Sequence, residues 1–533
     1  GLPIYPLATA PEATGGWEGR ANRSKSEDLQ DKSHVCTLEE RVTNTCTSIK
    51  TVNFMPMKYL VRRLVLCPIV AASGVLTAVV HAQDPVNDSI SRRVYDIPEV
   101  TVKARRTPPS VKAASPLQVM NKAEMERMGI SEVADAVRHF SGVSVKDYGG
   151  IGGLKTISVR SLGAQHTGVI YDGVSVSDCQ SGQIDISRFS LTNISQLTLT
   201  IGQSDDIYQS ARAFASAGVL HIQTDRPDFS EQNWHINTTL KAGSFGLANP
   251  SVLYSQQLSQ RTSFSLYGDY LRADGNYPFK LWNGNQLIDS KRNNSDIQTY
   301  RAEATLYTSF TPKQDLQVKA YLFDSERGLP GGVIYDNPYA AERLSDKNYF
   351  GQFRYENRFS EKFKLQALGK FNYSWNRDYN DEASGITDDR YRQTESYLSA
   401  TLWTEPLKGL SFSLAQDFAY NYLHTTLDKC QFPERFTYLT AFAARYEHNR
   451  FSVTASLLNT YITEKVRIGI AADDRKRLSP AFSVSWKPFL EAGLRIRASY
   501  KDIFRTPTFN DLYYLEIGNT SLRPETTRQG NLG

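Results

Sequence analysis

The chain has 533 residues, of which 40% are hydrophobic and 22% are charged, and its formal net charge is +5 at pH 7. This composition is ordinary for a folded protein of more than one domain, and the small net charge shows no electrostatic footprint of nucleic-acid binding. A mean hydropathy of -0.43 argues against a bundle of transmembrane helices and allows a membrane protein only of the β-barrel type, whose strands need no long apolar run.

The N-terminal region, residues 1–82, predicts an upstream extension followed by a targeting signal. We interpret residues 1–56, which begin with Gly, as an upstream extension and not as a domain. From Met57 the chain has a basic start, an apolar stretch over 64–80 and small residues leading to Ala82. This layout predicts a secretory signal peptide over 57–82. A transmembrane anchor is the alternative, because the apolar stretch reaches the short edge of spanning length.

Cysteine usage agrees with export. Cys36, Cys46 and Cys67 fall in segments that we expect to be absent from the mature protein, which leaves Cys179 and Cys430. The remaining pair forms neither a zinc motif nor a disulfide framework. Two solitary thiols are the simpler interpretation, and a single bridge in an oxidising compartment is the alternative.

Residues 83–107 form a polar segment that contains one extended stretch. The sequence DIPEVTVKARR, over 96–106, has β-prone residues at its centre, and Pro98 disfavours a helix. Such a stretch is suited to adding a strand to the sheet edge of a partner protein. An ordinary edge strand is the alternative.

Residues 108–226 predict a small α+β domain, which is long enough to fold around its own core. We expect short helices over 121–129 and 131–140, the second capped by Ser131. Val133, Ala136, Val137 and Phe140 share one face of that second helix. Short strands broken by Gly are expected around Val159 and over 168–176, 194–202 and 217–224.

One motif in this domain, GGIGGLKT over 149–156, resembles a phosphate-binding loop. Leu154 separates Lys155 from the last glycine, so the lysine is out of register to reach phosphates. We therefore interpret the motif as a glycine turn between two strands.

Period-two alternation of apolar and polar residues governs residues 232–533. It is clearest over 300–310, 363–375 and 494–501, and it predicts strands with one apolar and one polar face. The 29 Tyr and 25 Phe suit the interfacial girdles of a barrel better than a helical core. A soluble β-sandwich would show the same alternation.

The lengths of the connections distinguish these two folds. Tight turns are predicted at 258–262, 309–315, 359–363, 404–409, 447–450 and 487–493. Longer connections fall between them, at 273–297, 325–346, 377–391, 423–435, 461–477 and 502–523. Strict alternation of short and long connections is typical of outer-membrane barrels.

The fold class predicted from these patterns is mainly β: a transmembrane antiparallel β-barrel occluded by an N-terminal α+β plug. The alternation gives about fourteen strands by Gly533, the last beginning near Pro524. A lumen filled by a domain goes with roughly 22 strands, and open sheet edges in lipid are costly. We therefore expect a C-terminally truncated barrel.

From Asp96 to its end the chain resembles a TonB-dependent outer-membrane receptor. The resemblance lies in five stretches: 97–104 (a TonB box), 133–145 (the first plug helix and strand), 158–161 (the place of a strand ending in Arg-Gly), 168–176 (an Ile-Asp-Gly-Val strand) and 504–526 (a late barrel segment). One departure is 201–222, where Gln203, Gln209, Ala217 and His221 differ from the usual pattern. This departure weakens any assignment to one substrate branch.

The resemblance implies energised import of a scarce nutrient through the outer membrane of a Gram-negative bacterium, with no catalytic residue, cofactor or resident metal. The partners would be TonB with ExbB and ExbD, the lipid, and cobalamin or a ferric siderophore as ligand, and not nucleic acid. The box would bind TonB through Ile97, Pro98, Glu99, Val100, Thr101, Val102, Lys103 and Ala104. Ligand contacts would come from Ser177, Asp178, Gln180, Ser181, Gln183, Tyr277, Trp282 and Tyr335.

Three alternatives remain open at this point. A haem receptor of the same family would use His166 in the plug and His424 in a long loop. A passive porin would need neither a plug nor a box strand. A secreted β-rich enzyme would need a nucleophile or metal motif, and the sequence has no GxSxG, HExxH or paired-Cys pattern.

Overall fold

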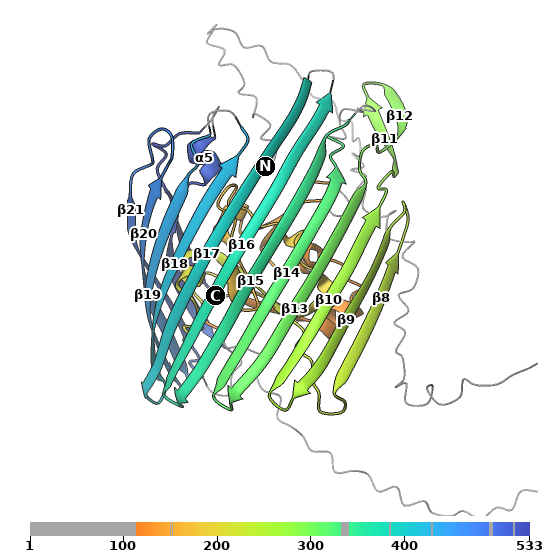
Figure 1. Ribbon diagram of the computed structural model, residues 1–533. Coiled ribbons are helices and arrows are strands. Elements are labelled where there is room, and N and C mark those ends of the chain that lie inside the picture. The colour runs from red at the N-terminus through yellow and green to blue at the C-terminus, as the bar shows by residue number, and fades with distance from the viewer. Residues whose placement is uncertain are drawn as a thin grey trace, which may run out of the picture. The chain divides into compact units, whose positions relative to one another are not determined.

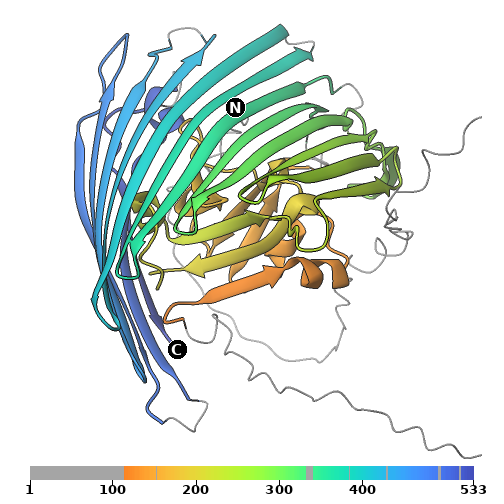
Figure 2. The ribbon, with the colours of Figure 1, turned by 60° about the horizontal axis from the view of Figure 1, so that its bottom comes forward.

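The computed structural model describes residues 113–533 except Gly150, Gly152, 332–339, 383–384, 428–429, 490–493 and 515–517. The described residues belong to one compact unit. Within it a large antiparallel sheet curves around a smaller domain (Figures 1 and 2). We call residues 113–224 the plug and residues 234–533 the barrel sheet. The signal peptide predicted over 57–82 and the box predicted over 97–104 lie outside the described residues.

The plug combines short strands and short helices. Its strands are β1 (Leu117–Asn121), β2 (Val143–Asp147), β3 (Lys155–Val159), β4 (Thr167–Tyr171), β5 (Val174–Val176), β6 (Ile194–Ile201) and β7 (Gly218–Thr224). Its helices are α2 (Lys122–Arg127), α3 (Val133–Arg138), α4 (Ala211–Ala215) and the 3-10 turns η1 (Ala164–His166), η2 (Ile186–Arg188) and η3 (Leu191–Asn193). The predicted α+β class is confirmed.

A five-stranded mixed sheet in the order β1-β6-β7-β4-β5 forms the centre of the plug. One face of this sheet packs on α3, whose predicted apolar face is buried as expected. The prediction that Ser131 caps this helix is wrong: Glu132 is the N-cap residue and makes no side-chain cap bond. The Ser131 carbonyl instead accepts a hydrogen bond from Lys241 on the barrel sheet.

Two other details of the plug bear on the predictions. Residues 168–176 are not one strand, because Asp172 and Gly173 both adopt positive φ, at 49° and 87°, and turn the chain between β4 and β5. This is the Asp-Gly signature of a tight hairpin turn. The glycine motif connects β2 to β3, as predicted, and Lys155 is buried beside Glu132 instead of being free for phosphate.

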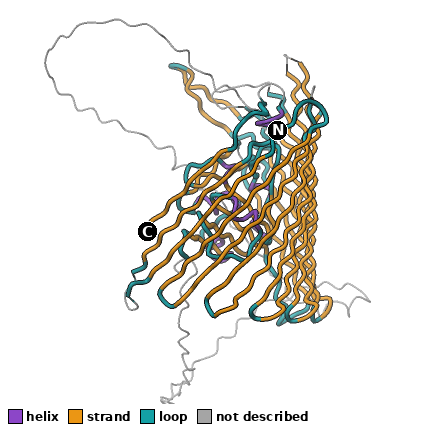
Figure 3. The backbone as a smooth tube through the Cα atoms, turned by 90° about the vertical axis from the view of Figure 1, so that its left-hand side faces the viewer, coloured by secondary structure: helices purple, strands orange, loops and turns teal. Residues whose placement is uncertain are grey.

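The barrel sheet has 14 strands in simple sequential order, which confirms the predicted number. They are β8 (Trp234–Ala242), β9 (Ala248–Ser259), β10 (Thr262–Ala273), β13 (Ile297–Thr311), β14 (Gln314–Gly328), β15 (Arg343–Ser360), β16 (Phe363–Glu382), β17 (Gly385–Leu407), β18 (Leu410–Thr425), β19 (Glu434–His448), β20 (Phe451–Lys465), β21 (Arg475–Trp486), β22 (Ile496–Arg505) and β23 (Glu525–Leu532). Figure 3 shows the tilted strands with the plug behind them.

The alternation read from the sequence sets which side chains face the plug. On β13, Tyr300 is 54% exposed on the outer face, whereas Glu303 is 4% exposed on the inner one. On β16 the same contrast holds between Phe371, at 56%, and Lys370, at 5%. The predicted apolar-outward, polar-inward strands are therefore confirmed.

Connections are short at one end of the sheet, except over 487–495 between β21 and β22, where a tight turn at 487–493 was predicted. Past the first hairpin they are mostly long at the other end. Three further details differ from the predictions. The connection from β10 to β13 contains a hairpin of its own, β11 (Pro278–Asn283) with β12 (Gln286–Lys291). The predicted loop over 377–391 is wrong: β16 and β17 continue pairing as far as Glu382 and Gly385, and Arg377 bonds Asp388 across the two strands at 2.6 and 2.9 Å. His424, predicted in a long loop, lies in β18.

Among the described residues there is no helix with the length and hydrophobicity that a membrane span requires.

Candidate functional site

The loop that follows β5, residues 177–185, lies at the long-connection end of the plug and contains five of the predicted ligand contacts. The Asp178 carboxylate accepts hydrogen bonds from the Ser181 amide at 2.7 Å and from its hydroxyl at 3.2 Å. Gly182 next to it has φ of +72°, a conformation that favours glycine. The loop thus folds on its own side chains and forms a compact apex.

Strand β17 holds this apex loop through Gln393 and Glu395. The Gln393 amide donates to Gln180 Oε1 at 2.9 Å and to Asp178 Oδ2 at 3.3 Å, and its carbonyl oxygen accepts from the Cys179 thiol at 3.1 Å. Ser177 donates to Glu395 on the same strand at 2.5 Å. The predicted contacts at the apex are therefore brought together, and all but the most buried of them, Gln180, are partly accessible.

A small recess lies between the apex loop and strands β14 to β16. Its volume is about 20 Å³, which is room for about one water molecule. Polar and aromatic side chains line it: Ser177, Asp178, Gln183, Asp185, Arg188, Phe189, Tyr321, Asn348, Phe350 and Asn372. Of these, Asp185, Arg188, Phe189 and the barrel residues were missed by the sequence analysis. Inward-facing polar positions on the strands were visible in the alternation, but their height relative to the plug was not.

Arg188 is the one cationic side chain of this recess. Burial opposes its charge, but the carboxylates of Asp346, Asp185 and Asp178 outweigh that effect and raise its pKa. Its Nε atom is buried and lies 3.9 Å from Asp185 Oδ2, an ion-pair distance, but forms no hydrogen bond within the described part of the chain. The guanidinium therefore retains a donor for an oxygen atom that enters the recess.

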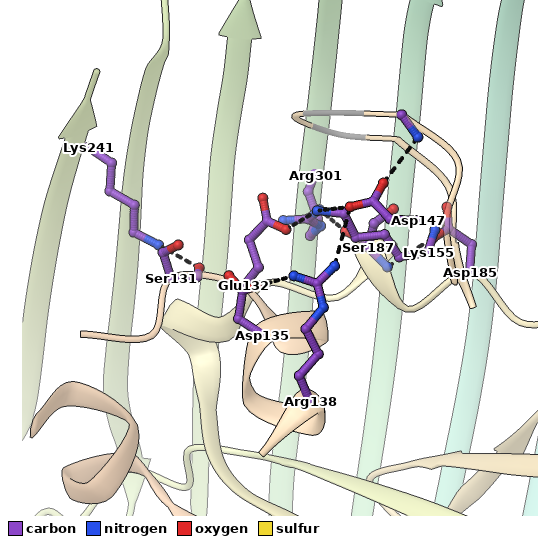
Figure 4. Close-up of polar contacts among 11 residues, drawn as sticks. Ser131, Glu132, Asp135, Arg138, Asp147, Lys155, Asp185, Ser187, Lys241 and Arg301 are labelled. Carbon is purple, nitrogen blue, oxygen red and sulfur yellow. Dashed lines mark hydrogen bonds and ion pairs between the residues drawn. The ribbon is translucent and has the colours of Figure 1, made fainter. Parts of the chain in front are cut away.

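The base of the apex loop is fixed by a polar network inside the plug (Figure 4). Asp185 accepts from the Lys155 amide at 3.0 Å and from the Ser187 amide at 2.9 Å. The Lys155 ammonium pairs with Glu132, and Arg301 of β13 donates to the Ser187 carbonyl at 3.3 Å. The network ties the helices, the apex and the barrel sheet to one another.

The connection between β22 and β23 folds over the apex. It contains α5 (Phe509–Tyr513), which begins with a capping box between Thr508 and Asp511. The amides of Phe509 and Asn510 each donate to an apex carbonyl at 3.0 Å, those of Cys179 and Gln180. A second recess of about 20 Å³ lies beside α5, lined in part by Cys430 and Tyr391.

Two buried charge clusters seal the plug against strands β13 to β17. Lys319, which is 1% exposed, pairs with Asp172 at 2.6 Å and Glu303 at 2.9 Å, and the Tyr171 hydroxyl donates to Glu303 at 2.7 Å. In the second cluster Glu395 pairs with Lys370 at 3.2 Å and with Arg212 of the plug at 2.8 Å. Rings pack around the first cluster, and Tyr321 stacks on Phe350 with centroids 4.5 Å apart.

The other predicted site residues do not join the apex. Tyr277 packs beside Phe245 and Phe279 near the β11–β12 hairpin, and Trp282 on β11 is 69% exposed. Tyr335 and the eight predicted box residues lie outside the described residues. These placements leave the apex as the candidate site.

The histidines and cysteines have separate environments. His166 pairs with Glu525 at 2.9 Å, whereas the His424 ring lies beside Phe432. Both Cys179 and Cys430 are free thiols, and burial raises the pKa of each. Within the described residues no group of three or more His, Cys, Asp or Glu side chains is placed to hold a metal ion.

Two protein-family descriptions match the chain. One, the TonB-dependent receptor plug domain, matches residues 109–216. The other, the TonB dependent receptor-like β-barrel, matches residues 252–533, which is more than half of the chain. The boundary between the two matches falls where the structure changes from plug to barrel sheet.

Solved structures share this fold at low sequence identity. The copper transporter OprC has a TM-score of 0.63 at 15% identity, over 78% of this chain and 68% of that one. The FrpB iron transporter from Neisseria meningitidis has 0.60 at 11%, over 76% and 65%. The siderophore receptor PirA from Pseudomonas aeruginosa has 0.58 at 14%, over 80% and 71%. At such identities the similarity shows the fold and not the ligand.

Proposed function

Since the chain belongs to the TonB-dependent receptors, a family of the Gram-negative outer membrane, we propose that it binds a scarce nutrient at the plug apex and imports it into the periplasm. In the outer membrane the long connections of the barrel sheet would face the outside of the cell, and the short turns would face the periplasm. The import is energised by TonB with ExbB and ExbD. The protein is a transporter that breaks no bond in its ligand.

The observation that carries this proposal is the bonded apex. The loop 177–185 is held by Gln393, Glu395 and the backbone of α5 through hydrogen bonds that a ligand can replace. A ligand that binds these groups better than they bind one another shifts the apex between two arrangements. Occupancy outside is thereby linked to the position of the plug.

The ligand class we propose is cobalamin or a ferric siderophore. Proteins of the same fold are described as transporters of copper, ferric citrate and iron, which favours a ligand that contains a metal. Ser177, Asp178, Gln180, Ser181 and Gln183 supply acceptors and donors from the plug. Arg188 adds a cation that suits an electronegative oxygen.

Energy transfer is proposed to use the stretch over 97–104. An extended segment with the sequence IPEVTVKA can add a strand to the sheet edge of TonB through its backbone amides and carbonyls. Proline at a position that must donate an amide hydrogen removes that bond. Val100 stands at the centre of the stretch and is the position to substitute.

The test is uptake of radiolabelled cobalamin and of ferric siderophores by cells that produce the receptor as their one route for these ligands. Val100→Pro is expected to abolish uptake and to retain surface binding. Val86→Pro, outside the stretch, is the matched control and should import normally. If Val100→Pro imports as well as the wild type, the energised mechanism is wrong and a passive channel takes its place.

A second variant tests the apex. Ser181→Ala with Gln183→Ala removes two side chains that lie in or beside the recess without touching the buried charge clusters. Surface binding of the transported ligand should weaken, by about tenfold for each hydrogen bond worth about 1.4 kcal/mol. Unchanged binding would place the ligand elsewhere, with Tyr277 and Trp282 as the next residues to substitute.

A further inference from the structure

The short turns of the barrel sheet share one pattern of charge. Five of them connect neighbouring strands through two residues each, at 260–261, 312–313, 361–362, 408–409 and 449–450. Glu361 is the one acidic residue in these turns. Each turn contains one basic residue, and we call these five the rim cations, because the turns lie along one rim of the sheet (Figures 1 and 3): Arg261, Lys313, Lys362, Lys408 and Arg450.

The geometry of the turns does not account for this pattern. Tight turns favour Gly, Pro, Asn and Asp, because these residues adopt the required backbone angles or bond the local backbone. Pro312, Gly409 and Asn449 meet that need, and the latter two have φ of 83° and 32°. The cation occupies the other position of each of these turns, where φ is not positive and many polar residues fit. Its presence in every turn therefore indicates a role outside the turn.

The rim cations are exposed, and the protein itself does not neutralise most of them. Arg261 donates a hydrogen bond to the Phe310 carbonyl at 3.1 Å. The side chains of the other four rim cations form neither an ion pair nor a hydrogen bond with any residue that the structure describes. Their charges are available to an anion that approaches this end of the sheet.

Comparable cations at the other end of the sheet have carboxylate partners. Lys280 pairs with Asp289 and Lys347 with Asp324, each at 3.4 Å. Arg377 pairs with Asp388 at 2.6 Å. These three cations provide a matched reference for the rim cations, because they have the same chemistry but are already neutralised.

The rim cations lie at the border of the outer, apolar face of the sheet. Lys362 precedes Phe363, Lys408 follows Leu407 and Arg450 precedes Phe451, and all three apolar side chains are exposed. Exposed aromatic rings at the ends of barrel strands mark the level at which hydrocarbon meets the lipid headgroups. A long basic side chain beside such a ring keeps its stem on the apolar surface and its charge among the headgroups.

The arrangement of the rim cations favours lipid over a protein partner. Successive turns are two strands apart, which is about 10 Å at about 4.8 Å per strand. The cations form a row one residue wide that follows the curve of the sheet (Figure 2). A specific protein interface needs a continuous patch of about 800 Å² on each partner, which such a row does not provide. Separate headgroups, each beside one turn, fit this spacing.

We propose that the rim cations bind the phosphate groups of anionic phospholipids, in the leaflet that borders the short-turn end of the sheet. The guanidinium and ammonium groups donate hydrogen bonds to phosphate oxygens, while the neighbouring apolar side chain packs on the acyl chain. The bound headgroups fix the height of the sheet in the bilayer. This inference needs the sheet to lie in a membrane, but it needs neither an imported ligand nor TonB.

The test compares two lipids of different headgroup charge at the surface of the whole receptor. Purified receptor is reconstituted in phosphatidylcholine vesicles with a trace of spin-labelled phosphatidylglycerol or spin-labelled phosphatidylcholine. Electron spin resonance separates lipid immobilised on the protein from free lipid. We expect the association constant of the anionic lipid to be about two- to fivefold higher, which corresponds to about 0.4–1 kcal/mol. In about 1 M salt, where the Debye length is about 3 Å, this preference should disappear.

Two triple variants examine the rim itself. Lys362→Gln with Lys408→Gln and Arg450→Gln is the rim variant, and it should remove most of the preference for the anionic lipid, because three of the five rim cations are lost. Lys362→Arg with Lys408→Arg and Arg450→Lys changes the same positions but conserves the charge. This second variant should keep the preference, which separates the effect of charge from any effect on the turns.

A third triple variant controls for the net charge of the receptor. Lys280→Gln with Lys347→Gln and Arg377→Gln also removes two lysines and one arginine, but from the other end of the sheet, where each is neutralised by a carboxylate. The preference for the anionic lipid should remain as in the unmodified receptor.

Each outcome decides the proposal. Loss of the preference in the rim variant alone supports it. A preference that persists in the rim variant, that is lost equally in the control variant, or that is absent from the unmodified receptor overturns it. Co-sedimentation with purified peptidoglycan is measured in parallel, and a rim variant that loses this binding with its lipid preference unchanged would assign the rim cations to the cell wall instead. Failure of nutrient uptake would contradict the proposed function and would leave the lipid result as it stands.

Discussion

The two sides on which the plug meets the barrel sheet differ in chemistry. Towards β13–β17 the contact consists of buried ion pairs and stacked rings around Lys319 and Glu395. Towards β18–β21 it consists of hydrogen bonds made by residues 203–209 and of an apolar cluster in which Ile207 and Phe214 pack against Leu439 and Leu458. Breaking a buried ion pair leaves an uncompensated charge, whereas water can replace a lone hydrogen bond. The first side is therefore held mainly by charge pairs, and the second by apolar packing and by hydrogen bonds that water can replace.

The largest effect is expected from removing Lys319, the central cation of the contact between the plug and β13–β17. Lys319→Met leaves the Asp172 and Glu303 carboxylates buried together, and we expect the free energy of unfolding of the plug to fall by about 3–5 kcal/mol. Pulse proteolysis of the purified receptor in urea measures this change. Lys347→Met is the matched control, because its pair with Asp324 is exposed and is worth about 0–1 kcal/mol. Equal losses would contradict the comparison.

Measuring the free energy of unfolding over a pH series examines the face of the plug sheet that carries His221. Burial lowers the pKa of His221 to about 4, whereas an unfolded histidine titrates near 6.5. Between these values the unfolded chain binds more protons, so stability is fully present above pH 6.5 and declines as the pH falls towards 4. We expect a loss of about 1–3 kcal/mol, because one pKa unit is worth about 1.4 kcal/mol and His221 is partly accessible.

The variant His221→Gln tests the origin of that slope. It should flatten the decline between pH 6.5 and 4 and should match the wild type in slope above pH 7. A decline that persists in the variant would mean that another group titrates.

The Asp-Gly turn between β4 and β5 presents Asp172 to Lys319. Distorting this turn therefore tests how much the contact with β13–β17 contributes to stability. Gly173→Ala places a Cβ atom in a backbone with φ of +87° and 3.2 Å from the Arg354 side chain. The expected cost is about 1–2 kcal/mol in the same unfolding measurement. Gly351→Ala, where the new Cβ meets nothing within 4 Å, is the control and should change stability little.

The smallest effect is expected at Asp205, whose carboxylate accepts from the Ala114 amide at 2.7 Å and from the Ser483 hydroxyl at 3.3 Å. Asp205→Asn keeps the shape of the side chain but replaces charge-assisted bonds to Ala114 and Ser483 by weaker neutral ones. We expect stability to fall by only about 0.5–1.5 kcal/mol. A loss as large as that of Lys319→Met would show that both sides of the plug are sealed equally.

The sequence predicts the strands well, because a barrel has the same period-two rule along its whole length. Fourteen strands and the inward side chains, such as Glu303 and Lys370, follow from that rule. The extension of β16 and β17 was missed because residues 377–391 are polar on both faces, so nothing in the pattern separates a protruding hairpin from a loop. Ser131 was misjudged by one residue, which is a common uncertainty at helix ends.

The candidate site was predictable only in part. The five apex residues follow a recognisable strand, so their gathering could be expected. Gln393 and α5 reach the apex through long-range contacts that depend on how far the plug sits along the strands. No local sequence pattern encodes the position of the plug along the barrel strands. The hydrogen bond between Ala114 and Asp205 could likewise not be predicted, because the two residues are 91 positions apart in the sequence.

Strand length changes strongly around the barrel sheet, and this has a consequence for encounter with the ligand. β8 has nine residues and β17 has 23, and β16 with β17 projects past its neighbours (Figure 1). At 3.3 Å per residue the difference amounts to about 45 Å of extended chain. A hairpin with a complete ladder loses little conformational entropy on contact, unlike an unpaired loop. The β16–β17 hairpin is therefore a stiff projection in the middle of the sheet, whose shape is set before any molecule diffuses to it.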